Sequence, residues 1–351
     1  MSELKSCVKK IFNPDADDSN RKIFCGESTN LLDLSSVKYP SFITLVDDVM
    51  YPNNWLPQKV SNMEQDSYQY KKDLTEDERE AYNNIISFLV FLDSVQTNNL
   101  PSIADYITLP EINYFLARQT YEEAIHSRSY AYIGINVMSV EEFHEIVYRW
   151  KTNPILLKRN EYIASVYDEC KIHRDADHFM LDLNANLALE GLYFYNGFQF
   201  FHNLANRNLM IATDVQIKYI QRDEQVHCQG FTDIIKLFLK EEPQYRKRFE
   251  EIAYPFWEKA VQMEIEFSQS IIGDKILGMS SQSIEDYAYY LGNKRLKAIG
   301  LEEIFPKRKN PYRHLERIAS IEDETTNRAN QFETTSIVYK SPEIIDGWDE
   351  I

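Results

Sequence analysis

Apolar positions in this 351-residue chain recur at helical spacing from about residue 31 to about residue 318. The segment Thr75–Glu78 has the form of a capping box, which predicts the start of a long helix. Pro101 and Pro110 are expected to bracket the connection that follows it. Pro110 also suits the first turn of the next helix, since that position needs no amide hydrogen.

Further along the chain, Ser139 predicts another helix start, and long helical patterns cover about 177–205, 209–238 and 243–272. A shorter helical pattern begins near Ser283. No run of residues stands out as alternating in the way that a half-buried strand would. The sequence therefore predicts an all-α fold whose helical domain spans residues 31–318.

Both ends of the chain differ from this helical region. Residues 1–30 are polar and predict an N-terminal arm, and residues 319–351 are rich in acids and predict a flexible C-terminal tail. The tail nevertheless carries spaced apolar residues, among them Tyr339 and Trp348. That spacing favours a peptide that docks on a partner, although composition alone equally allows an inert solvated tail.

The composition narrows the class of protein. Hydrophobic residues make up 44% of the chain, enough for a sizeable core, and the net charge of -17 disfavours nucleic acid or an anionic membrane as a partner. The first residues include no apolar signal segment, so a cytoplasmic protein is expected. The four cysteines are widely separated, which favours reduced thiols over a disulfide framework.

The motif Glu-x-x-His carries the candidate chemistry. On a helix, residues three apart share a face, so both side chains can reach one metal ion. A third copy, Glu141 with His144, follows the Ser139 cap in a polar segment and is interpreted as surface. The other two copies lie deep in apolar helices, and each has one acid on an apolar helix upstream. The predicted metal ligands are Asp93, Glu123, His126, Glu190, Glu224 and His227.

Two helical hairpins that each give one carboxylate and one Glu-x-x-His form the ligand set of a four-helix dinuclear metal bundle. Taken singly, a buried acid or histidine of this kind is more often an ordinary core or salt-bridge residue than a metal ligand. Four buried carboxylates together, however, would be prohibitive without positive charge, and two divalent cations supply that charge. Oxygen and imidazole ligands suit iron or manganese.

Tyr130 follows His126 by four residues and therefore faces the same region. Phe194, Phe198 and Ile220 lie at helical spacing from the predicted ligands and would form an apolar pocket around it. A phenol shielded from water beside an oxidising metal pair is able to persist as a radical, although spacing alone more often marks ordinary core. Asp223 points about 100° away from Glu224, which predicts a residue that orients a ligand histidine rather than a seventh ligand.

Five motifs together resemble a known family, the small radical-generating subunit of class I ribonucleotide reductase, over roughly residues 30–318. They are Asn54-Trp55 with Pro57, Phe91–Val95 around Asp93, Glu123–Tyr130, Glu190 with Phe194 and Phe198, and Arg222–His227. The resemblance implies a ferritin-like bundle and an oxidoreductase that holds two iron ions per chain, with manganese in some relatives.

The resemblance also implies roles for single residues. Dioxygen would oxidise the metal pair and leave a stable radical at Tyr130, and Trp55, Asp223 and His126 would relay the oxidising equivalent toward the surface. Tyr339 would pass it to a large subunit on which the C-terminal tail docks. That subunit would reduce ribonucleoside diphosphates to deoxyribonucleotides for DNA synthesis, and the small subunit would be a homodimer.

Other proteins built on the same type of bundle fit the sequence less well. A soluble desaturase or monooxygenase would need no relay, so Trp55, Asp223, Tyr130 and the tail count against it. An iron-storage protein would need no buried tyrosine pocket, and a scaffold without metal would leave four core acids unexplained.

Overall fold

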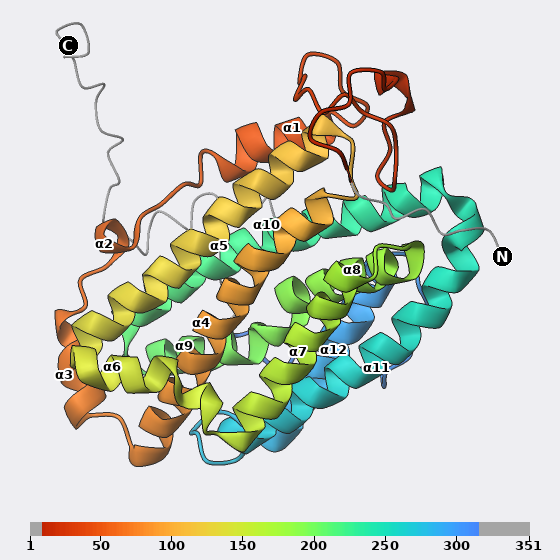
Figure 1. Ribbon diagram of the computed structural model, residues 1–351. Coiled ribbons are helices and arrows are strands. Elements are labelled where there is room, and N and C mark those ends of the chain that lie inside the picture. Colours follow the sequence, from red (N-terminus) through yellow and green to blue (C-terminus); the bar gives the residue numbers. More distant parts are fainter. Residues whose placement is uncertain (1–8, 316–351) are drawn as a thin grey trace, which may run out of the picture.

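The computed structural model describes residues 9–315, and within this range it contains helices and turns but no strand (Figure 1). The all-α prediction is therefore confirmed. The α-helices are α1 Ser41–Thr44, α2 Pro57–Val60, α3 Glu64–Lys72, α4 Glu76–Ala104, α5 Pro110–Val137, α6 Val140–Val147, α7 Pro154–Ile172, α8 Ala176–Ala188, α9 Tyr195–Asn206, α10 Ile211–Glu241, α11 Arg246–Ile271 and α12 Ser281–Ala298. Two π-helical segments, η2 Leu45–Met50 and η4 Leu189–Tyr193, and three short 3-10 turns, η1 Asp18–Asn20, η3 Arg149–Lys151 and η5 Pro243–Tyr245, complete the set.

Long helices lie side by side and form the body of the molecule (Figure 1). Helix α4 packs along α5, and α10 contacts α5, α8 and α9. Helix α8 also packs against α7 and α11, and α12 covers α11. The centre of the bundle is thus enclosed by α4, α5, α10 and the α8–η4–α9 segment.

The predicted helix starts are confirmed by their capping contacts. Thr75 accepts a hydrogen bond from the amide of Glu78, whose side chain accepts one from the Thr75 amide, so the capping box at α4 is complete. The Ser139 side chain caps α6 by accepting a hydrogen bond from the Glu142 amide, and Pro110 stands in the first turn of α5. These signals are local, since each cap satisfies amides that the first helical turn leaves unpaired.

The prediction that Pro101 bounds a connection is wrong, because α4 continues through it to Ala104. A proline removes one helical hydrogen bond, but near a helix end that loss is small compared with the apolar contacts of the last turn. Leu100 and Ile103, on either side of Pro101, are fully buried and keep this turn on the bundle.

The predicted helix at 177–205 is also interrupted. It consists of α8 and α9 joined by the π-helical segment η4, in which Glu190 lies. A π-helical turn widens the backbone by one residue per turn and re-aims the side chains that follow, and such turns are frequent at functional sites. The break therefore occurs where a candidate ligand must point into the bundle.

The N-terminal segment contacts the bundle, since Ile23 is fully buried and Lys9 donates hydrogen bonds to the carbonyl oxygens of Ala104 and Ile107. The expectation of reduced thiols is wrong at Cys25, which is disulfide-bonded, whereas Cys170 and Cys228 are free and buried. None of the helices in the described part of the chain is long and apolar enough to cross a membrane.

Candidate dinuclear metal centre

Six predicted ligands meet at the centre of the bundle. Asp93 comes from α4, Glu123 and His126 come from α5, and Glu190 comes from η4. Helix α10 supplies Glu224 and His227. All six side chains are fully buried. Segments more than a hundred residues apart in the sequence therefore converge on one enclosed site.

These side chains form two overlapping groups. In each group the possible ligand atoms lie within 4.8 Å of one another, which is close enough to surround one metal ion. Glu123 and Glu224 belong to both groups, whereas the other four belong to one each. The first group adds Asp93 and His126, and the second adds Glu190 and His227. Two shared carboxylates between two such groups are the arrangement of a carboxylate-bridged metal pair.

Both histidines present Nδ1 to the cluster. The distance from His126 Nδ1 to the Glu224 carboxylate is 3.0 Å, and the distance from His227 Nδ1 to the same carboxylate is 2.9 Å. Their Nε2 atoms face carboxylates outside the cluster, Asp223 at 3.4 Å and Glu122 at 2.9 Å. A carboxylate behind a ligand histidine fixes the ring and makes its inner nitrogen a better ligand.

The pKa shifts in the metal-free cluster show that its carboxylates need positive charge nearby. Burial and the neighbouring Glu123 raise the pKa of Asp93 well above its usual range, and burial with Glu123 and Glu224 does the same for Glu190. Burial alone would lower the pKa of His126 and of His227, but Glu224 and other carboxylates raise both. Without metal, protons must therefore supply part of the positive charge that two cations would bring.

Unpaired polar atoms also fit a metal pair. Within the described residues, both carboxylate oxygens of Asp93 and one oxygen each of Glu123 and Glu190 have no hydrogen-bond partner. Buried oxygens without partners are costly unless a cation coordinates them. The donor set of four carboxylates and two imidazoles suits iron and manganese.

Three residues around the cluster were missed by the sequence analysis. Gln96 and Gln119 donate hydrogen bonds to one oxygen of Glu190, the second at 2.7 Å, and so hold that carboxylate in place. Glu122 faces His227 and is itself paired with Arg118 at 2.8 Å. One signal pointed to Glu122: it precedes Glu123 just as Asp223 precedes Glu224.

Replacing Glu122 with glutamine should weaken metal binding at one of the two positions. The amide keeps the size of the side chain but loses the charge that fixes His227, and the expected loss of affinity is about 10–100-fold. Competition with a chelator of known affinity measures it. A matched control is Glu80→Gln, which removes an exposed ion pair with Arg149 far from the cluster. Equal affinities in both variants would contradict the role assigned to Glu122.

Trp55 lies next to this centre. Its indole Nε1 donates a hydrogen bond of 2.6 Å to Asp223 Oδ2, the same oxygen that faces His126. Although burial opposes it, the charges of Arg222 and His126 lower the pKa of Asp223, so this carboxylate stays ionised. The Trp55 ring also packs against Tyr219 with the ring centroids 5.2 Å apart. A chain of direct contacts thus runs from the cluster through Asp223 to Trp55.

Two arginines anchor the segment that carries Trp55. Arg222 donates to the carbonyl oxygen of Asn53 as well as to Asp223. Arg118 donates to the carbonyl oxygen of Met50 and to Asn54 while it pairs with Glu122. Each carboxylate behind a candidate ligand histidine is therefore tied to the same loop.

Tyr130 is fully buried on α5, and the predicted pocket residues Phe194, Phe198 and Ile220 are also fully buried. The rings of Phe194 and Phe198 stack with centroids 5.6 Å apart. No hydrogen-bond partner for the Tyr130 hydroxyl exists within residues 9–315. Burial, and then the negative charge of Asp93, raise the pKa of this phenol well above its usual value. The phenol is therefore dry and protonated beside the cluster.

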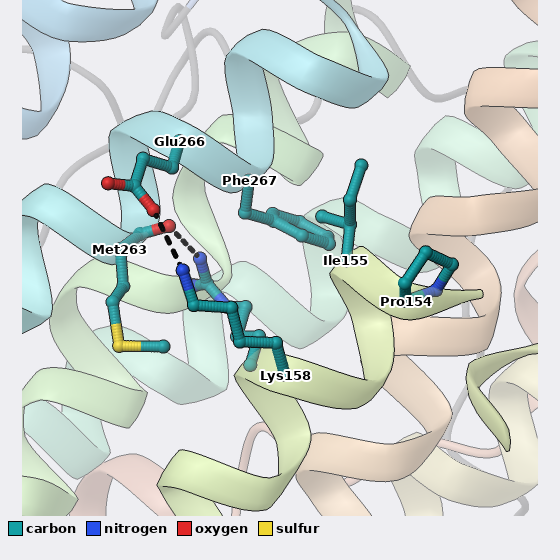
Figure 2. Close-up of a pocket in the computed structure, with 7 residues that line it drawn as sticks. Pro154, Ile155, Lys158, Met263, Glu266 and Phe267 are labelled. Carbon is teal, nitrogen blue, oxygen red and sulfur yellow. Dashed lines mark hydrogen bonds and ion pairs between the residues drawn. The ribbon is translucent and has the colours of Figure 1, made fainter. Parts of the chain in front are cut away.

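Other candidate positions lie apart from this centre. Glu141 and His144 are exposed, as predicted for the surface copy of the motif. A pocket of about 310 Å³ between α7 and α11 is lined by seven residues, none of which is a predicted site residue (Figure 2). An ion pair of 3.5 Å between Lys158 and Glu266 lies at this pocket. Tyr339 lies outside the described residues.

Comparisons with known proteins agree with this geometry. The profile of the family described as "Ribonucleotide reductase, small chain" matches residues 32–311. The ribonucleoside-diphosphate reductase subunit beta of Treponema pallidum is 36% identical over 342 residues, which cover 96% of this chain and 97% of that protein. The corresponding subunit of Halalkalibacterium halodurans is 33% identical, with 98% of each chain covered.

Solved structures show the same fold. The ribonucleotide reductase R2 subunit from Clostridium botulinum superposes with a TM-score of 0.82 at 37% identity, over 87% of this chain and 96% of that one. The dimanganese(II) NrdF of Streptococcus sanguinis, at 20% identity and a TM-score of 0.66, covers 81% of this chain and 96% of that one and shares the fold. The bundle, its buried centre and these matches together show that the chain belongs to the ribonucleotide reductase small-chain family, as the beta subunit of a ribonucleoside-diphosphate reductase with a ferritin-like fold.

Proposed function

We propose that this subunit holds two iron ions in the carboxylate cluster, uses dioxygen to form a stable radical at Tyr130, and passes the oxidising equivalent to a large subunit. That subunit would use it to reduce ribonucleotides to deoxyribonucleotides for DNA synthesis in the cytoplasm. The observation that carries the proposal is the unbroken contact path His126–Asp223–Trp55, which begins at the cluster that Tyr130 adjoins.

The bound metal pair would supply the activation of dioxygen and the one-electron oxidation of the phenol. The protein has to hold the six ligands, exclude water and accept the phenolic proton. Since the raised pKa of Tyr130 keeps its proton in place at neutral pH, oxidation to a neutral radical must remove one electron and one proton together. Asp93 is the carboxylate whose charge acts most strongly on the phenol.

Burial protects the radical after it has formed. Tyr130 and the three apolar residues Phe194, Phe198 and Ile220 are fully shielded from solvent, so small reductants in water cannot reach the phenol directly. The oxidising equivalent would instead leave through the hydrogen-bonded residues Asp223 and Trp55. Asp223 and Trp55 are 4% and 5% exposed, whereas His126 is fully buried, so the path leads away from the enclosed cluster.

Tyr339 in the C-terminal tail would continue the path, and the apolar residues at the end of the tail would dock on the large subunit. Neither lies within residues 9–315. Two copies of this chain would form the small subunit, which sedimentation of the purified protein tests. The related dimanganese protein makes manganese the second candidate metal, because the same carboxylate and imidazole ligands suit both ions.

The test is to load metal-free protein with ferrous iron, and in parallel with manganous ion, under anaerobic conditions and then to admit oxygen. Electron paramagnetic resonance should show a tyrosyl radical in the iron-loaded sample, and adding the large subunit should give reductase activity. Activity only in the manganese-loaded sample would replace iron by manganese. Two bound ions with neither radical nor activity under either metal would overturn the radical mechanism.

A further inference from the structure

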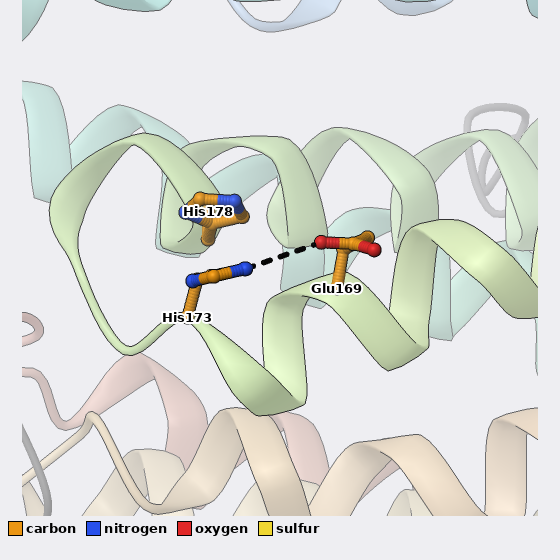
Figure 3. A group of neighbouring side chains, drawn as sticks. All are labelled: Glu169, His173 and His178. Atoms are coloured by element: carbon orange, nitrogen blue, oxygen red, sulfur yellow. Dashed lines mark ion pairs between the residues drawn. The ribbon is translucent and has the colours of Figure 1, made fainter.

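A second cluster of metal-ligating side chains lies at the turn between α7 and α8, apart from the buried centre. Glu169 is in the last turns of α7, His173 is its C-terminal cap, and His178 is in the first turn of α8 (Figure 3). Their possible ligand atoms lie within 4.8 Å of one another. Two imidazoles and a carboxylate from two helices therefore converge on one point.

Contacts with neighbouring groups prepare His178 for this role. Its Nδ1 lies 2.8 Å from Asp175 Oδ1, and its backbone amide donates to the same oxygen at 3.0 Å. In the tautomer that donates Nδ1–H to Asp175, the lone pair of Nε2 is available to bind a cation. A carboxylate behind a histidine is the usual support of a ligand imidazole in metal sites.

His173 and Glu169 complete the cluster. Their Nε2 and Oε2 atoms are 3.3 Å apart, and the rings of His173 and His178 have centroids 4.8 Å apart. A surface ion pair between residues four apart on a helix contributes little and does not explain why a second imidazole lies against the first. Side chains of Glu169 and His173 are 60% and 51% exposed, so a cation can enter from solvent.

We propose that Glu169, His173 and His178 bind one divalent transition-metal ion of the zinc class, with water completing its coordination. Zinc takes nitrogen and carboxylate oxygen at about 2.0–2.2 Å, so two such ligand atoms stand at most about 4 Å apart. Small rotations of the exposed Glu169 and His173 side chains toward the half-buried His178 close the present separations to that value. The ion would join the end of α7 to the start of α8, the helix that leads into η4 and Glu190.

Zinc uptake by the full chain tests this proposal. Equilibrium dialysis against micromolar zinc, followed by elemental analysis, should show one zinc ion fewer per chain in His173→Gln and in His178→Gln than in the wild type. The Asp175→Asn variant keeps a helix cap but loses the charge behind His178, and it should bind this zinc about 10–100-fold more weakly. Circular dichroism of the metal-free variants checks that they fold.

A matched control is His144→Gln, because His144 is also exposed and follows Glu141 by three residues, close to the spacing of four between Glu169 and His173. It should bind as much zinc as the wild type. Unchanged zinc uptake in the His173 and His178 variants would overturn the proposal. An equal loss in His144→Gln would overturn it too, since surface histidines would then bind zinc only adventitiously. The dinuclear centre is intact in all these variants, so its occupancy cancels in the comparison.

Discussion

The Tyr130→Phe variant should bind two metal ions as the wild type does and should lose reductase activity by at least about a thousandfold, which corresponds to about 4 kcal/mol in activation free energy. Phenylalanine keeps the ring but has no hydroxyl hydrogen to lose, so no stable radical can form at this position. Activity measured with the large subunit and paramagnetic resonance of the oxygen-treated protein give the two readouts.

Stability should not explain that loss. The Tyr130 hydroxyl has no hydrogen-bond partner in the described part of the chain, so its removal should change the free energy of unfolding by less than about 1 kcal/mol. The control is Tyr82→Phe, which removes an equally buried hydroxyl that contacts Thr213 at 3.2 Å. We expect that control to retain activity. Full activity in Tyr130→Phe would show that the radical resides elsewhere.

Replacing a shared carboxylate should cost both metal ions, whereas replacing an unshared one should cost one. Glu224 belongs to both ligand groups, so the Glu224→Gln variant is expected to bind neither ion at micromolar metal. Asp93→Asn leaves the group of Glu190 and His227 complete, and Glu190→Gln leaves the group of Asp93 and His126 complete. Each of these variants should keep one ion, as counted by elemental analysis after dialysis.

The stability of the metal-free protein gives a second readout. Asp93→Asn should lower metal binding but should not lower this stability. Burial and Glu123 raise the pKa of Asp93, so at neutral pH this acid either stays protonated or lowers the stability of the fold. A neutral asparagine at position 93 removes that cost, and metal-free Asp93→Asn should be at least as stable as metal-free wild type in chemical denaturation. Loss of both ions in Asp93→Asn, or a clearly less stable metal-free variant, would contradict the division into shared and unshared ligands.

Local signals in the sequence predicted much of this structure. The Thr75 capping box, the Ser139 cap and Pro110 act within one helical turn, so their outcome depends little on the rest of the fold. The two buried Glu-x-x-His motifs were recognisable because apolar neighbours surround them. Metal coordination by the six residues remains a prediction, although the structure brings their side chains together.

Features that depend on tertiary contacts were not predictable in the same way. The continuation of α4 through Pro101 follows from the burial of Leu100 and Ile103, and the π-helical turn at Glu190 has no pattern of its own. Helix α7 was not singled out, although Asn153 caps it and Pro154 opens it. The pairing of Glu122 with His227 joins two helices that are far apart in the sequence, so the position of Glu122 before Glu123 does not by itself reveal its partner.

The carboxylates behind the two candidate ligand histidines come from the opposite hairpin in each case. Glu122 stands beside Glu123 in sequence but supports His227 of the other motif, and Asp223 stands beside Glu224 but supports His126. A chimaera that took residues 76–137 from one relative and 176–241 from another would therefore place each histidine against an acid from the other relative. Changes at position 122 are expected to be accepted only alongside changes around position 227.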